Sequence, residues 1–166
     1  MIFNLPIIAA AALIPLLIGF IWYNPKTLGN AWMSAAGITE ETMKGSNMAL
    51  IFGLTYLFSF FASFALVGSI FHLNHVFSLV MGDPGMSDPN SEVSLFLKDV
   101  VAKYGSNFRT FKHGALHGAI VGITLALPII TVNALFERKG FKYIAINAGF
   151  WIVCFLLMGG VLCAFS

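Results

Sequence analysis

Four long apolar segments without any Asp, Glu, Lys or Arg constrain this chain more than any other feature of its sequence. A helix needs about 20 apolar residues to cross the hydrocarbon layer of a bilayer. Lipid cannot hydrogen-bond to bare backbone, and the segments lack the alternation of barrel strands, so each is predicted to be a helix. They cover about residues 3–23, 47–72, 114–136 and 143–165.

The composition agrees with lipid as the solvent for much of the chain. Hydrophobic residues make up 58% and charged residues 10% of the 166, whereas soluble domains have about 45–50% and about 25%. The small net charge of +2, without a long basic run, argues against nucleic acid as a partner. We expect an all-α membrane protein with four transmembrane helices in a single domain, residues 1–166.

The longest connection, about residues 73–112, carries one further helix. Its apolar residues recur at helical spacing over 91–104, Ser91 or Asn90 can cap the start, and Gly105 can end it. The segment is too short and too charged to span a bilayer. It is therefore predicted to be an amphipathic helix that lies at the membrane surface or on the other helices.

The ends of the spans predict an orientation. Trp22 and Tyr23 are typical of the belt where aromatic rings anchor a helix at the headgroups. Four spans place both termini on the side of the 73–112 connection, whereas the opposite side holds most of the Lys and Arg close to the membrane. Because cytoplasmic loops are enriched in these residues, both termini are predicted to lie outside the cytoplasm.

Small and polar residues within the spans predict how the helices pack. Gly114, Gly118 and Gly122 drift by only about 40° per step along a helix, so they form one groove that lets another backbone approach closely. The partner is a helix of the same chain or of a second copy. The tight 137–142 connection makes the last two spans a hairpin, in which Asn133 and Asn147 lie at similar depth and could hydrogen-bond.

Four histidines are predicted to lie at one membrane level. His113 and His117 share a face at the start of the third span, and His72 and His75 share a face at the end of the second. Two such pairs on facing helices can bind Zn²⁺ or another transition metal, or haem. Three acidic residues of the connection could support such a site, namely Asp83, Asp88 and Glu92.

The same histidines have plainer interpretations. Histidine at headgroup depth can hydrogen-bond to water, lipid phosphate or backbone, and it can take part in proton transfer or pH sensing. On the plain interpretation no cofactor is expected. The sequence also lacks a phosphate-binding glycine loop, a nucleophile elbow and a carboxylate within a span, so no enzymatic activity is expected.

Several motifs resemble one known family. They are WYNP at 22–25, GNAW at 29–32, GITEE at 37–41, HGALHG at 113–118, NALFERKG at 133–140 and NAGFWIVCFLLMGG at 147–160. Together these resemble the bacterial membrane-protein family called domain of unknown function 1761. The resemblance implies a small four-span protein of the bacterial cytoplasmic (inner) membrane, and no activity or catalytic residue. The resemblance also implies that the 73–112 connection is longer than in the plain form of the family.

These observations favour a non-enzymatic integral membrane protein that acts through helix packing. It would be an accessory subunit of a membrane complex or a self-associating protein, with the lipid bilayer and other subunits, or further copies of itself, as partners. The alternative is a metal- or haem-binding membrane protein that uses His72, His75, His113 and His117 at one membrane interface.

Overall fold

The computed structural model describes residues 4–166, and within that range the regular elements are all helices, with no strand. Four helical stretches are long and apolar enough to cross a membrane, namely Leu5–Trp22, Met48–Ile70, Phe111–Phe136 and Phe141–Phe165. The predicted all-α class with four spans is confirmed, and the protein is a multi-pass membrane protein. The predicted start of the first span at residue 3 lies outside the described residues.

The spans differ in how many helices build them. The first contains α1 (Leu5–Ala11) and α2 (Ile14–Trp22), the second is α5 (Met48–Ile70), and the fourth is α10 (Phe141–Phe165). The third joins α8 (Phe111–Val121) and α9 (Leu127–Phe136) through a π-helical turn, η2 (Gly122–Ala126). The connections hold α3 (Gly29–Ala36), α4 (Glu40–Met43), α6 (His72–Leu79), the 3-10 turn η1 (Pro84–Ser87) and α7 (Glu92–Tyr104).

Two prolines account for the interruptions. Pro15 lies at the second position of α2, directly after the turn that separates α2 from α1. In the third span the Leu127 N–H donates to the Gly122 carbonyl, five residues back, and Pro128 follows. Proline lacks an N–H and its ring crowds the carbonyl four residues earlier. The wider turn before Pro128 relieves that crowding while the helix continues.

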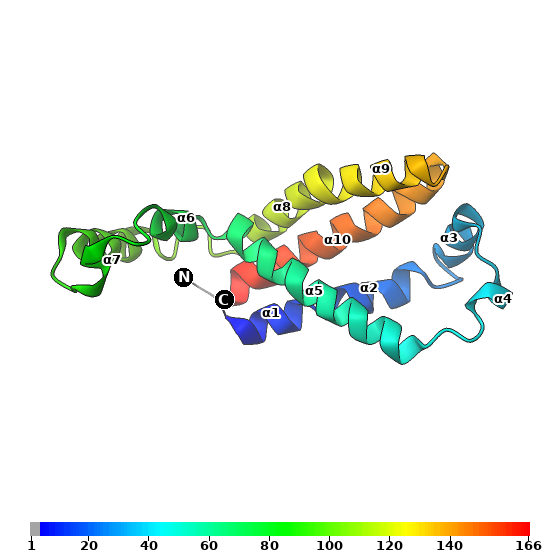
Figure 1. Ribbon diagram of the computed structural model, residues 1–166, viewed down its shortest axis with the longest axis horizontal. Coiled ribbons are helices and arrows are strands. Elements are labelled where there is room, and N and C mark those ends of the chain that lie inside the picture. Colours follow the sequence, from blue (N-terminus) through cyan, green and yellow to red (C-terminus); the bar gives the residue numbers. More distant parts are fainter. Residues whose placement is uncertain (1–3) are drawn as a thin grey trace.

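The four spans form a bundle around α10, which contacts α1, α2, α3, α5, α8 and α9. Figure 1 shows α8 and α9 running antiparallel along α10, with α1, α2 and α5 on its other sides. The start of α1, the end of α5, the start of α8 and the end of α10 lie together at one end of the bundle. Beyond that end α6 and α7 continue as an extension, and α3 and α4 lie at the opposite end.

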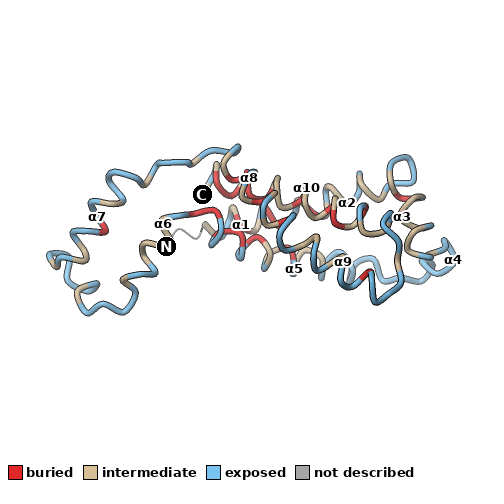
Figure 2. Tube along the Cα trace, turned by 90° about the horizontal axis from the view of Figure 1, so that it is seen from above, coloured by how far each residue is buried: buried red, intermediate tan, exposed pale blue. Residues whose placement is uncertain are grey.

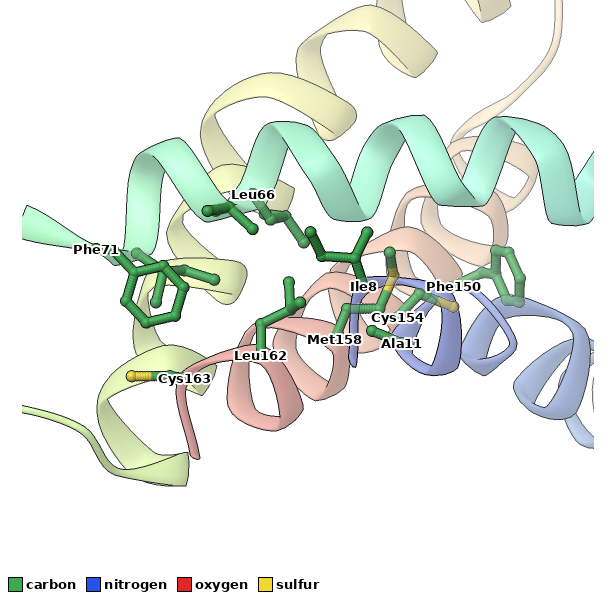
Figure 3. Close-up of a cluster of buried hydrophobic side chains, with 11 residues drawn as sticks. Ile8, Ala11, Leu66, Phe71, Phe150, Cys154, Met158, Leu162 and Cys163 are labelled. Carbon is green, nitrogen blue, oxygen red and sulfur yellow. The ribbon is translucent and has the colours of Figure 1, made fainter. Parts of the chain in front are cut away.

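The core lies where α1, α5 and α10 meet. Figure 3 shows Ile8, Leu66, Met158 and Leu162 pointing toward one another, and each is almost fully buried. Figure 2 shows buried segments along the middle of the bundle and exposed ones around it. The exposed large side chains of the spans are themselves apolar, as Phe58 at 63% exposure illustrates. An apolar exterior suits helices that face lipid rather than water.

The extension contains the predicted extra helix. Helix α7 covers Glu92–Tyr104, its N-cap Ser91 accepts a hydrogen bond from the Ser94 N–H, and Gly105 follows its last residue. Leu97 is its buried residue. The existence and extent of this helix agree with the prediction from the sequence, and its place at the membrane surface stays a prediction.

Candidate metal centre

The first residue of the candidate centre follows a break in the helix at the end of the second span. Helix α5 ends at Ile70, Phe71 is extended with φ −97° and ψ 97°, and α6 begins at His72. Phe71 is 4% exposed and belongs to the core cluster, which anchors the break. The sequence predicted one helix through residue 72. The break instead lets His72 reach the start of α8.

The start of α8 supplies the other two histidines. Thr110 caps this helix, since its hydroxyl accepts a hydrogen bond of 3.3 Å from the His113 N–H. His113 and His117 follow one turn apart, so their side chains project from the same face. The cap therefore sets the helical register that points two imidazoles toward the end of α5.

The three imidazoles converge on one small volume. Nε2 of His72 lies 3.1 Å from Nε2 of His113. The ring centroid of His117 lies 4.5 Å from that of His113 and 5.1 Å from that of His72. One ring nitrogen from each residue lies within 4.8 Å of the other two. His72 is exposed, and His113 and His117 are half-buried.

Neighbouring groups hold two of these rings in place. The Phe108 ring stacks on His113 with centroids 5.1 Å apart and an interplanar angle of 26°. The backbone of Ser69 in α5 is placed to accept a hydrogen bond from the His117 ring. Metal-binding histidines typically use their second ring nitrogen in such a bond, which orients the first.

Phe108 adopts a backbone conformation that is rare for a large side chain. Its φ of 61° is left-handed, which costs roughly 1–2 kcal/mol for residues other than glycine. Its carbonyl accepts hydrogen bonds from the Thr110 N–H at 2.8 Å and from the Cys163 thiol at 3.2 Å. These bonds and the stacking on His113 stabilise a conformation that places an aromatic ring against the histidines.

The structure brings together three of the four predicted histidines. His75 is exposed and does not belong to the group. The prediction assumed that His72 and His75 continued the second span and faced the third. Because the helix is interrupted at Phe71, both histidines instead lie on α6. This helix leads away from the bundle (Figure 1), and His75 lies farther along it than His72 does.

The acidic residues suggested as supporting ligands have local partners instead. The Asp83 carboxylate accepts a hydrogen bond from the Gly85 N–H, and that of Asp88 accepts one from the Asn90 N–H. Neither these residues nor Glu92 belongs to the histidine group.

The predicted glycine groove lies against α10 of the same chain. A Cβ added to Gly114 would meet the Gly159 carbonyl, and one added to Gly118 would meet the Phe155 carbonyl, both inside van der Waals contact. Gly122 also faces α10. Of the two partners that the sequence left open, the structure shows the helix within the chain.

The two asparagines of the last hairpin do not bond to each other. Asn147 Nδ2 donates to the Tyr143 carbonyl at 2.8 Å, and its Oδ1 lies 3.2 Å from the Tyr23 hydroxyl. Asn133 is exposed. The predicted pairing assumed that both side chains turn into the hairpin, whereas Asn147 turns toward α2.

The two predicted interface anchors pack against α10. Trp22 Nε1 donates to the Ile146 carbonyl at 3.1 Å, and the Tyr23 ring lies 5.1 Å from that of Phe150 and 5.1 Å from that of Trp32. Both residues are half-buried. They attach the end of the first span to the fourth, and their predicted place at the headgroups stays a prediction.

Sequence reasoning missed two residues beside the centre. Phe108 and Arg109 lie in the loop that leads into α8, and nothing in their spacing marks them as neighbours of the histidines. The Arg109 guanidinium lies 4.3 Å over the Phe71 ring. A usable signal was the position of Arg109 just before a span that begins with two histidines.

Comparisons with known proteins assign this chain to a family whose description names no activity. Neither the search of curated proteins nor the search of solved structures found a match. One family profile matches residues 6–163, which is nearly the whole chain. The chain therefore belongs to the family described as "Protein of unknown function (DUF1761)".

Proposed function

We propose that this membrane protein binds a divalent transition metal ion, best fitted by Zn²⁺, through His72, His113 and His117. The observation that carries the proposal is the convergence of three imidazole nitrogens within 4.8 Å of one another. Imidazole is the ligand that Zn²⁺, Cu²⁺ and Ni²⁺ share, and a site of three histidines leaves one position open for water or a ligand.

The distances support an ion of this size. Two nitrogens bound to tetrahedral Zn²⁺ at about 2.0–2.1 Å are themselves about 3.3 Å apart. The His72 and His113 nitrogens, at 3.1 Å, already have that spacing. The widest separation in the group, up to 4.8 Å, needs a movement of about 1.5 Å, which rotation of the histidine side chains can supply.

A small ion fits this arrangement better than haem does. Two histidines that ligate one haem iron bind on opposite faces of the macrocycle and must leave room for it between them. The His72 and His113 nitrogens at 3.1 Å leave no such room. The plainest alternative is a hydrogen bond between these two neutral imidazoles, and it does not explain why His117 joins them.

Metal binding is tested on protein purified without a histidine tag. Elemental analysis and a Zn²⁺ titration against a competing chelator should give about one ion per chain. His117→Ala should abolish this binding. His75→Ala is the matched control, because it removes an exposed histidine outside the group and should leave the affinity unchanged. Equal weakening by both variants, or protein that takes up no stoichiometric metal, would contradict the proposal.

A second candidate function is the interaction role of an accessory or self-associating subunit. Its support is the extension, where Leu95, Phe96 and Val101 of α7 are exposed apolar residues outside the four spans. Native mass spectrometry from a mild detergent should give a mass larger than that of one chain. Replacing Leu95 and Phe96 by serine should release the monomer, and a monomeric unmodified chain would rule self-association out.

We also propose that the protein resides in the bacterial cytoplasmic membrane with both termini outside the cytoplasm. The support is the enrichment of Lys and Arg on the opposite side. Reporter fusions at the C-terminus test it, because a reporter that is active only outside the cytoplasm should be active there.

A further inference from the structure

A cavity of about 290 Å³ opens beside the histidines, at the place where α6 and α7 leave the bundle. Most of its lining is apolar, with Ile70 and Leu73 on the α5–α6 side and Val100 and Tyr104 on the α7 side. Its volume is at the lower end of the range for small-molecule sites, about 300–1,000 Å³. It can hold a headgroup and part of a chain, and it is too small for a whole two-chain lipid.

One side of this cavity is cationic. Arg109 lines it and stacks 4.3 Å over Phe71. Its Nε donates to the Gly105 carbonyl and its Nη1 donates to the main-chain oxygen of Ser166, at 3.4 Å each. Charge-assisted hydrogen bonds to an anion are much shorter, about 2.7–2.9 Å.

Arg109 has unused capacity to bind an anion. A guanidinium carries five N–H donors, and two of them make these long bonds. Among the described residues, no Asp or Glu side chain forms a salt bridge with it. The cation is half-buried, so an anion placed there would be less screened than one at a fully exposed arginine.

The position of the cavity matches a molecule with two unlike ends. It lies at the ends of the Met48–Ile70 and Phe111–Phe136 spans, where the apolar bundle meets the extension. A polar ligand would gain nothing from the apolar lining, and an uncharged apolar one would not use the N–H donors of Arg109 that bond to neither Gly105 nor Ser166.

We propose that this cavity binds a single-chain amphiphile with an anionic headgroup, whose head pairs with Arg109 and whose chain lies between α6 and α7. The shared chemistry is a carboxylate or phosphate on one acyl or alkyl chain. This inference does not depend on metal binding at the histidines.

Binding is measured with the full chain in nanodiscs of uncharged phosphatidylcholine, using radiolabelled dodecanoate and subtracting empty nanodiscs. Dodecyl phosphate and dodecanol serve as competitors. Dodecanoate should bind saturably and dodecanol should compete far more weakly. Competition by dodecyl phosphate would assign phosphate headgroups to the site as well, and its failure would restrict the site to carboxylates. Dodecanol that competes as well as dodecanoate would overturn the proposal.

Two charge variants separate the site from general attraction to a cationic surface. Arg109→Gln should weaken dodecanoate binding at least about tenfold, since hydrogen bonds to charged groups are strong. Lys112→Gln removes the same charge three residues away at an exposed position outside the cavity and should change binding less than about twofold. Equal effects of the two variants would overturn the proposal.

A third variant and a cross-link locate the chain. Val100→Trp should fill the cavity and abolish binding, with thermal unfolding checked to show that the variant is folded. A dodecanoate analogue with a diazirine at its end should label α7, and labels confined to the lipid-facing sides of α5 and α9 would overturn the proposal.

Metal binding at the histidines and amphiphile binding in the cavity can be tested independently of each other. His72 and His113 line the cavity and His117 does not, so His117 is the ligand whose removal affects the metal alone. His117→Ala should therefore lose Zn²⁺ and keep dodecanoate, whereas Arg109→Gln should lose dodecanoate and keep Zn²⁺.

Discussion

Replacing Gly118 by alanine should loosen the contact between α8 and α10. The new Cβ would point into the backbone carbonyl of Phe155. A flexible side chain could turn away from such a contact, but a carbonyl within a helix cannot. The two helices must therefore move apart along their shared seam, which also includes Gly114 and Gly122.

The size of the effect follows from two opposed contributions. Overpacking a tight contact costs about 1–3 kcal/mol. Alanine in place of glycine within a helix contributes up to about 1 kcal/mol in the other direction. Gly68→Ala is the matched control, since a Cβ there would meet nothing within 4 Å. The difference between the two variants isolates the steric cost.

The assay is thermal unfolding in detergent, followed by circular dichroism and by size-exclusion chromatography. For a chain of this length, 1 kcal/mol corresponds to about 2–4 °C in Tm. The Gly118 variant should therefore melt about 2–12 °C below the Gly68 variant. Its size before melting should not change, because the helix that fills the groove belongs to the same chain. Equal melting temperatures, or conversion of a dimer to a monomer, would refute the reasoning.

Three further predictions use other parts of the structure. Zn²⁺ binding should weaken as the pH falls from 7.5 to 5.5, because a protonated imidazole cannot bind a metal, and a titration at these two pH values checks it. Asn147→Ala should lower the free energy of unfolding by about 0.5–1.5 kcal/mol because it removes the partner of Tyr23, whereas Asn133→Ala at an exposed position should change it by less than about 0.5 kcal/mol. Cysteines placed at positions 88 and 140, in a chain whose two native cysteines are replaced, should react with an impermeant reagent from opposite sides of the membrane, and reaction from one side would contradict the hairpin.

The spans could be predicted from the sequence because one physical requirement dominates them. Any segment that crosses lipid must satisfy its own backbone, so a charge-free run of this length leaves helix as the solution. The N-terminal cap of α7 could be predicted from the sequence for a similar reason. Ser91 accepts a hydrogen bond from the Ser94 N–H, which satisfies a donor that a helix start leaves unpaired.

The candidate centre was only partly predictable because it depends on a break that no local pattern marks. Phe71 lies in an unbroken apolar run, and its extended conformation follows from burial in the core rather than from its neighbours in sequence. If the second span continued as one helix through this point, His75 would face the third span as His72 does. The place of Phe108 beside the histidines could not be predicted for the same reason, since its ring approaches His113 only in the folded chain.

The seam between α8 and α10 also limits how this chain can vary. A Cβ at Gly114 would meet the Gly159 carbonyl, and a Cβ at Gly159 would meet the Gly114 carbonyl. In most packed pairs, a larger residue on one side is tolerated when its partner becomes smaller. Here both partners already have the smallest side chain possible, so no second substitution at the facing position can compensate for the first. The two glycines are therefore a pair that can be lost only by moving a whole helix.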